Sequence, residues 1–142
     1  MFTTTRAIQV EWGDCDPAGI VFYPRYFAWF DACTAGLFAA AGLPKPLLLK
    51  QYGIVGIPMV DTAAQFHLPS RFGETFQVET SAVAFRRSSF DIRHRILKDG
   101  AVAVEARETR VWTAADPEKP LRLKSKPIPK EVIALLTEGP RP

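Results

Sequence analysis

The segment 25–41 limits the folds open to this chain more than any other feature of the sequence. Its apolar positions recur at the three- and four-residue spacing of an α-helix, and Gly42 and Pro44 form a stop signal after it. Because apolar side chains occur on nearly every side of this helix, we expect most of its surface to be buried. A helix of that kind needs a sheet wrapped around it. The positions with helical spacing are Phe27, Phe30, Thr34, Leu37, Phe38 and Ala41.

The segments on both sides of this helix favour β-strands. Turn residues separate the later strands, and Asp99-Gly100 is a typical signal for a two-residue hairpin. The pattern predicts an α+β domain in which an antiparallel sheet of about five to six strands wraps around one long central helix. The expected strands cover 3–12, 58–68, 74–85, 89–97, 101–113 and 120–126, and short helices are expected over 45–52 and 129–136.

Length and composition indicate one domain over residues 1–142. A chain of 142 residues with 47% hydrophobic side chains can bury a core of its own. We expect residues 139–142 to be a disordered tail. The sequence has no apolar run of membrane-spanning length and no secretory leader, and its two cysteines form no Cys-x-x-Cys motif. We therefore expect a cytoplasmic protein with no membrane partner.

The formal net charge of +3 is unevenly distributed. Residues 1–64 contain four basic and five acidic residues, whereas the rest of the chain contains fourteen basic and ten acidic ones. A basic second half is compatible with nucleic acid, with a phosphorylated ligand or with a solvated face. Because no recognisable nucleic-acid-binding motif is present, we expect no nucleic-acid partner, and a basic binding module remains the less favoured alternative.

The loop before the long helix contains a carboxylate in a restricted backbone. Pro17 biases Asp16 toward an extended conformation, and Gly19 can adopt the positive φ of a sharp turn. Asp and Gly in such loops are often only turn formers or helix caps. The apolar residues that follow would desolvate the carboxylate, which favours a reactive Asp16 instead.

The start of the helix can stabilise negative charge on an oxygen atom. Pro24 suits the first helical position, where its missing N–H costs nothing. We expect free backbone N–H groups near Tyr23 and Arg25. Such donors, together with the helix dipole, suit an oxyanion.

Other catalytic groups are poorly supported. The sequence contains no Gly-x-Ser-x-Gly elbow, and the acidic neighbours of Cys15 disfavour a thiolate. His67 and His94 do not have metal-ligand spacing, so we expect no metal site. We expect both histidines to be packing or surface residues.

The segment Asp14-Cys15-Asp16-Pro17-Ala18-Gly19-Ile20-Val21-x-Tyr23-Pro24 resembles the active-site signature of the 4-hydroxybenzoyl-CoA thioesterase family. This family is a branch of the hot-dog-fold acyl-CoA thioesterases. The resemblance implies a hot-dog fold and hydrolysis of an aromatic or other small acyl-CoA, similar to 4-hydroxybenzoyl-CoA, to free acid and CoA. No cofactor is implied, because CoA is part of the substrate.

The resemblance also implies roles for residues of the signature. Asp16 matches the catalytic carboxylate, which acts as nucleophile or as general base. The backbone N–H of Tyr23 matches the donor that polarises the thioester carbonyl. Asp14 is expected to orient the loop.

A basic turn lies between two expected strands. Arginines in such a turn often form only a solvated edge that prevents aggregation. By resemblance, Arg86, Arg87 and Ser88 fall where the family binds the CoA phosphates, and Arg122 lies at a matching late position. Guanidinium groups suit phosphate oxygens.

One position departs from the family pattern. Ile57 stands where the 4-hydroxybenzoyl enzyme has a hydroxyl-bearing side chain, and Ile cannot bind a phenol through a hydrogen bond. A less polar aroyl group or another acyl chain is therefore expected. Asp31 keeps a position that matches the family, so both residues are candidates for binding the acyl group.

The resemblance further implies a homo-oligomer, a dimer or a tetramer with active sites at subunit interfaces. An alternative with the same fold is hydrolysis of an acyl-carrier-protein thioester, since the basic residues would accept either carrier.

Overall fold

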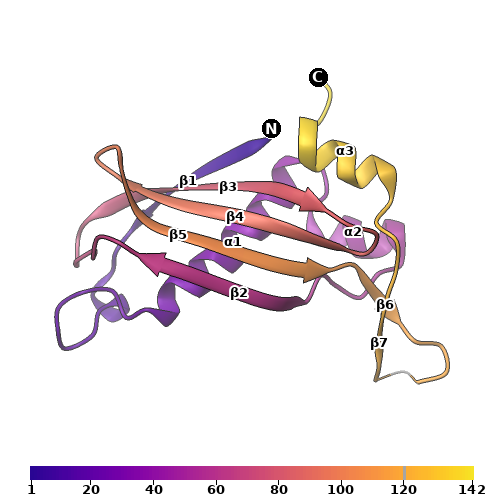
Figure 1. Ribbon diagram of the computed structural model, residues 1–142, viewed down its shortest axis with the longest axis horizontal. Helices are drawn as coiled ribbons and strands as arrows, with labels where there is room; N and C mark the ends of the chain where they lie inside the picture. Colours follow the sequence, from indigo (N-terminus) through magenta and orange to yellow (C-terminus); the bar gives the residue numbers. More distant parts are fainter. Residues whose placement is uncertain (120) are drawn as a thin grey trace.

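The computed structural model describes residues 1–119 and 121–142. Five antiparallel strands form one sheet, and the long helix α1 lies across one of its faces (Figure 1). The elements are β1 (Thr3–Gln9), the 3-10 turn η1 (Trp12–Asp14), α1 (Pro24–Ala40), α2 (Lys45–Tyr52), β2 (Met59–Phe66), β3 (Thr75–Phe85), β4 (Ser89–Lys98), β5 (Ala101–Val111), β6 (Thr113–Ala115), β7 (Leu123–Ser125) and α3 (Lys130–Glu138).

The strand order is β1-β3-β4-β5-β2, so β1 and β2 form the two edges. Hairpins connect β3 to β4 and β4 to β5, and β2 pairs with β5. The hairpin predicted at Asp99-Gly100 is confirmed. Both residues are left-handed, with φ of 50° and 82°, and Lys98 pairs with Ala101 around them. Positive φ at both central positions gives the turn a twist that matches the strands.

The α+β class and the hot-dog arrangement of a sheet around a long helix are confirmed. The strand expected over 120–126 differs from the prediction. Its first residue, Pro120, lies outside the described residues, and β7 covers only Leu123–Ser125. This strand pairs with β6 in a separate two-stranded sheet and not with the main one.

The prediction that most of helix α1 is buried is wrong for the single chain. The sheet covers only one side of the helix, and small residues such as Ala28, Ala35 and Gly36 face away from the core and are exposed. Within the described chain no single helix could span a membrane; α1 and α2 reach the required length and composition only as a pair bent by 65°. The buried residues of α1 are Tyr26, Phe30, Cys33, Thr34, Leu37 and Phe38.

Two apolar clusters lie between α1 and the sheet. One surrounds Leu37 and Trp112, and the other surrounds Phe30 and Phe76. Each fully buried side chain of this size contributes about 1.5–3 kcal/mol to folding. The alternation predicted for β4 is confirmed, because its inward positions are buried, and they include His94 at 0% exposure.

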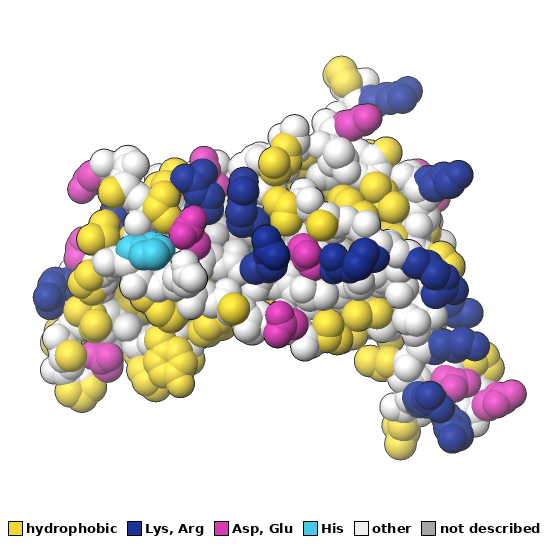
Figure 2. All heavy atoms as spheres, viewed as in Figure 1, with side chains coloured by type: hydrophobic (Ala, Val, Ile, Leu, Met, Phe, Trp, Pro, Cys, Tyr) yellow, Lys and Arg dark blue, Asp and Glu magenta, His cyan; other side chains and the backbone are white. Residues whose placement is uncertain are grey.

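The outer face of the sheet is charged. Figure 2 shows Lys and Arg side chains in a row across it, with acidic side chains between them. Neighbouring strands place Arg93 opposite Arg107, and Arg95 opposite Glu105. Much of the positive charge of the second half therefore lies on a solvated face.

Candidate active site

The signature loop is held by main-chain hydrogen bonds. The Phe22 N–H donates to the Asp14 carbonyl oxygen at 2.8 Å, and the Val21 N–H donates to the Ser70 carbonyl oxygen at 2.9 Å. Asp14 also accepts a hydrogen bond from the Glu11 N–H at 2.8 Å through Oδ2. Gly19 has a φ of 80°. These contacts agree with the expected rigid loop and with a positioning role for Asp14.

Asp16 is part of a tight turn inside this loop. Its Oδ1 accepts a hydrogen bond from the Ala18 N–H at 2.9 Å, and its backbone N–H donates to the Ile20 carbonyl oxygen at 2.9 Å. Within the described chain no hydrogen bond engages Oδ2. The turn-forming interpretation therefore holds for one carboxylate oxygen, while the other is available for chemistry.

The surroundings of Asp16 are only partly apolar. The residue is half-buried, in a groove that also includes Trp12, Pro17 and Phe72. The two aromatic rings meet edge to face, with centroids 5.5 Å apart, and both side chains are largely exposed. The desolvation expected for this carboxylate is therefore incomplete in a single chain.

The helix start provides one available donor and not two. Pro24 is the first helical residue, as predicted. The Arg25 N–H donates to the Phe22 carbonyl oxygen at 2.9 Å, so the prediction of a free N–H at Arg25 is wrong. For Tyr23, the described residues offer its N–H no hydrogen-bond acceptor. The candidate oxyanion donor is thus the Tyr23 N–H, seven residues after Asp16 and directly before the first residue of α1.

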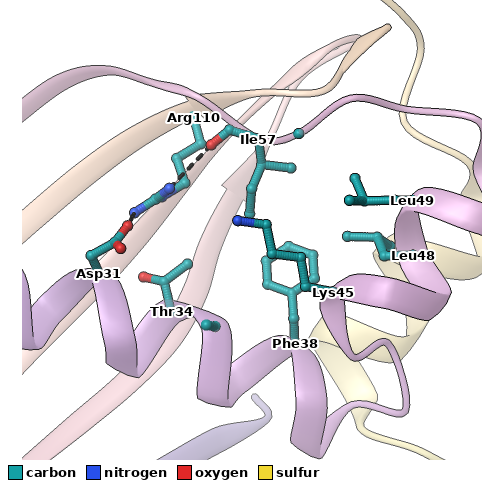
Figure 3. Close-up of a pocket in the computed structure, with 10 residues that line it drawn as sticks. Asp31, Thr34, Phe38, Lys45, Leu48, Leu49, Ile57 and Arg110 are labelled. Carbon is teal, nitrogen blue, oxygen red and sulfur yellow. Dashed lines mark hydrogen bonds and ion pairs between the residues drawn. The ribbon is translucent and has the colours of Figure 1, made fainter.

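Asp31 and Ile57 line one pocket, between α1, α2 and β5 (Figure 3). Phe38, Leu48 and Leu49 provide apolar walls. Asp31 is the acidic group of this pocket, and its side chain is 67% exposed. The lining residues are Asp31, Thr34, Ala35, Phe38, Lys45, Leu48, Leu49, Gly56, Ile57 and Arg110.

Arg110 organises the polar side of this pocket. Its Nη2 donates to Asp31 Oδ1 at 2.7 Å, its Nη1 donates to the Ile57 carbonyl oxygen at 3.1 Å, and its Nε donates to Glu108 Oε1 at 2.9 Å. Burial acts to lower the pKa of Arg110, but Glu108 and Asp31 outweigh it and raise that pKa. The arginine is therefore a fixed cation.

Glu108 is buried at 1% exposure and remains ionised. Burial acts to raise its pKa, and the contacts with His94, Arg110 and Thr34 overcome this and lower the pKa. Sequence reasoning missed both charged residues. The sequence feature that could have revealed them is the alternation of β5. Ala106, Glu108 and Arg110 share one face of this strand, and the first of them is apolar.

The basic turn after β3 is partly engaged in local structure. Arg86 binds Asp91 at 2.6 Å and Ser89 Oγ at 2.7 Å. The carbonyl oxygens of Arg87 and Ser88 accept hydrogen bonds from the backbone N–H groups of residues 128 and 112. The Arg87 side chain is exposed, as is that of Arg122 in the β6–β7 hairpin.

The structure does not bring Asp16 and the basic turn together within one chain. The Asp16 groove contains Phe72, which precedes β3, whereas Arg86 directly follows the end of β3. An eleven-residue strand spans about 36 Å. Asp16 and the basic turn therefore lie at opposite ends of the sheet.

Comparison with known proteins agrees with the signature. The model of the Thioesterase-like superfamily matches residues 10–136. The 4-hydroxybenzoyl-CoA thioesterase of Pseudomonas sp. (strain CBS-3) is 35% identical over 137 residues, which cover 92% of this chain and 95% of the relative.

Solved structures show the same fold. A mutant of 4-hydroxybenzoyl-CoA thioesterase complexed with 4-hydroxybenzoyl-CoA superposes with a TM-score of 0.85 at 34% identity, covering 94% of this chain and 98% of the other. A gentisyl-coenzyme A thioesterase superposes with a TM-score of 0.78 at 30% identity, covering 95% and 100%. The chain therefore belongs to the thioesterase-like superfamily and, within it, to the hot-dog-fold acyl-CoA thioesterases related to 4-hydroxybenzoyl-CoA thioesterase.

Proposed function

We propose that this acyl-CoA thioesterase hydrolyses the thioester of a hydroxylated aromatic acyl-CoA to the free acid and CoA. The observation that supports the proposal is the signature loop, which contains a carboxylate oxygen of Asp16 and the N–H of Tyr23, neither of them hydrogen-bonded within the described chain. The family membership of the chain supplies the reaction class.

The proposed chemistry needs one acid and one donor. The thioester carbonyl oxygen accepts a hydrogen bond from the Tyr23 N–H, which stabilises the negative charge of the tetrahedral intermediate. Asp16 either attacks the carbonyl carbon, so that a mixed anhydride forms and water later hydrolyses it, or it takes a proton from an attacking water. CoA leaves as a thiolate, because a thiol pKa of about 8.5 makes strong protonation unnecessary. No metal or cofactor takes part in this scheme.

The pocket next to Asp31 suits an aromatic acyl group that carries one hydroxyl. Phe38, Leu48 and Ile57 can pack against an aromatic ring. Asp31 can accept a hydrogen bond from a ring hydroxyl, because within the described chain only its Oδ1 is engaged. The Ile57 side chain offers no second polar group, which by itself favours the less polar acyl group expected from the sequence. The proposal of a hydroxylated acyl group instead rests on Asp31. The relatives named above act on 4-hydroxybenzoyl and gentisyl groups, which both carry hydroxyls.

Binding of the carrier is assigned to the second half of the chain. Arg87 and Arg122 have exposed guanidinium groups suited to CoA phosphates. Arg86 and Ser88 complete the expected set, although Arg86 already binds Asp91.

We infer a homo-oligomer, a dimer or a tetramer, with each active site between subunits. The separation of Asp16 from the basic turn supports this, because one CoA ester must reach both. Two further features agree with it. The edge strand β2 is paired on only one side within the described chain, and large apolar side chains are exposed near the signature loop, among them Trp12, Phe22, Phe66 and Phe72. Free thiols at Cys15 and Cys33 agree with a reducing, cytoplasmic setting.

The test is a panel of thioesters assayed by thiol release. It contains 4-hydroxybenzoyl-CoA, gentisyl-CoA, benzoyl-CoA and hexanoyl-CoA, and the same acyl groups on acyl-carrier protein, with the Asp16→Asn variant as a blank. We expect the hydroxylated aroyl-CoAs to have the highest kcat/KM. Preference for hexanoyl-CoA would contradict the acyl assignment, and preference for carrier-protein esters would contradict the carrier assignment.

A further inference from the structure

A buried hydrogen-bonded chain runs from the sheet to the candidate acyl pocket. It begins at Thr80 on β3 and continues through His94 on β4, Thr34 on α1 and Glu108 on β5. All four side chains are at most 1% exposed. The chain continues through Arg110 and ends at Asp31, which is exposed in the pocket.

The hydroxyl of Thr34 sets the direction of the hydrogen bonds at the centre of this chain. The Thr34 hydroxyl donates to Glu108 Oε1 at 2.7 Å, so Thr34 Oγ1 acts as acceptor toward His94 Nε2 at 3.3 Å. His94 Nε2 therefore carries a proton, and it also lies 3.2 Å from Glu108 Oε2. On the other side of the ring, Nδ1 and the Thr80 hydroxyl share a hydrogen bond of 2.8 Å. The His94 ring is held between these contacts and stacks on Phe30, with ring centroids 4.7 Å apart.

Arg110 connects this buried chain to two walls of the pocket. All three guanidinium nitrogens are used, on Glu108, on Asp31 and on the carbonyl oxygen of Ile57. The first contact anchors the arginine in the core. The other two contacts connect Arg110 to helix α1 and to the loop before β2, on two sides of the pocket (Figure 3).

Burial of the charged side chains of Arg110 and Glu108 is energetically unfavourable, which indicates that they have a role besides stability. A buried ion pair seldom stabilises a fold more than well-packed apolar residues do. Arg110 is 6% exposed and Glu108 is 1% exposed, between two apolar clusters that could have continued across this position. Lysine could not replace the arginine, because an ammonium lacks the planar fork that reaches three acceptors in one plane.

We propose that Arg110 is a positioning residue for acyl recognition, which holds the Asp31 carboxylate and the Ile57 carbonyl in place while Glu108 fixes the arginine. This inference rests on the proposed hydrolysis of hydroxylated aroyl-CoA. Its consequence is that selection of the ring hydroxyl by Asp31 depends on Arg110 and Glu108, which act through the position of that carboxylate.

The experiment compares kcat/KM for 4-hydroxybenzoyl-CoA with kcat/KM for benzoyl-CoA, and takes their ratio as the hydroxyl discrimination. It uses Arg110→Lys, Asp31→Asn and the double variant. Arg107→Lys is the matched control, since it makes the same change on the outer face of the same strand. We expect Arg110→Lys and Asp31→Asn each to lower the discrimination about tenfold, mainly through KM for the hydroxylated substrate. The double variant should lose no more than Asp31→Asn alone, because both changes act through one carboxylate.

Two results would overturn the inference. Either Arg110→Lys lowers kcat/KM equally for both substrates, as a merely structural residue would, or the losses of the two single variants multiply in the double variant. If Arg110→Lys does not fold, Glu108→Gln keeps the arginine and an amide oxygen for it, and unchanged discrimination in that folded variant would also count against the inference. Failure of the proposed function is a separate result, in which the unmodified protein hydrolyses neither aroyl-CoA.

Discussion

The guanidinium of Arg110 lies 2.7 Å from the carboxylate of Asp31, and this contact joins a buried strand to the exposed face of helix α1. Arg110 is inside the core, whereas Asp31 faces the acyl pocket. Without this contact, an exposed Asp side chain on a helix would populate several rotamers. The contact leaves the Asp31 side chain fixed on one oxygen and accessible on the other.

The first prediction concerns the signature carboxylate. Asp16→Asn should lower kcat by about 10²- to 10⁴-fold, the range for loss of an essential acid or base group. The amide oxygen of Asn can still accept the hydrogen bond from the Ala18 N–H, so the turn and the melting temperature should be retained. Thiol-release kinetics and thermal unfolding measure the two quantities. Asp14→Asn is the comparison at the neighbouring carboxylate. A larger loss of kcat in that variant would show that Asp14, and not Asp16, carries out the chemistry.

A second prediction follows from the distance between Asp16 and Arg87. If each site draws on two subunits, the variants Asp16→Asn and Arg87→Glu are each impaired but complement one another. After unfolding and refolding of an equimolar mixture, about one quarter of the unmodified activity should return at subsaturating substrate, because half of the dimers are mixed and each has one intact site. Activity equal to the mean of the two separate variants would indicate that each site lies within one chain.

The basic turn gives a third prediction, in which neighbouring arginines differ. Arg87→Ala should raise KM for the CoA ester about threefold to tenfold, and this effect should shrink at high salt. Arg86→Ala should mainly lower the free energy of unfolding, by about 1 kcal/mol, because Arg86 binds Asp91 and Ser89. Steady-state kinetics at two ionic strengths measure the effect on KM, and urea denaturation measures the effect on the free energy of unfolding. The reverse pattern would assign the phosphate contact to Arg86.

A fourth prediction addresses the departure at Ile57. Ile57→Thr introduces a hydroxyl into the acyl pocket and shortens the side chain by one carbon. It should increase the preference for 4-hydroxybenzoyl-CoA over benzoyl-CoA by about threefold to tenfold, the effect of one neutral hydrogen bond. Ile57→Val is the control for shape, since it removes a methylene without adding a polar group. Equal preferences in the Thr and Val variants would show that the acyl ring does not reach this position.

The fifth prediction concerns acid stability. Hydrogen bonds from Arg86 and Thr109 hold the pKa of Asp91 below its usual value, with Arg86 as the larger cause. Because the folded pKa is lower than the unfolded one, the contribution is fully present above the unfolded pKa of about 4 and is lost as pH falls through the folded pKa. Asp91→Asn should therefore lower the melting temperature at pH 7, and the difference should diminish below pH 4. A constant difference from pH 7 to pH 3 would contradict this assignment.

The local features of the fold followed from the sequence because they depend on neighbouring residues. Helical spacing over 25–41, the Asp99-Gly100 turn and the alternation of β4 each concern contacts within a few positions, and each is confirmed. The end of the sheet was harder to predict. The residues after Val111 form a separate small hairpin, and strand propensity does not specify which strand a segment pairs with.

By itself, the sequence determined the α+β class, the rigid turn around Asp16 and the proline-capped helix start, since these follow from backbone restrictions and short-range periodicity. The hot-dog fold followed from the resemblance of the signature segment to a known family. Only the tertiary structure decided that Asp31 and Ile57 share a pocket, that Arg110 holds both, and that the basic turn lies far from Asp16. The physical reason is that hydrogen bonds between residues distant in sequence, such as Asp31 and Arg110, depend on strand order and register. Two buried charges on β5 look in sequence like any polar residues of a strand, and only packing against α1 makes them part of a site.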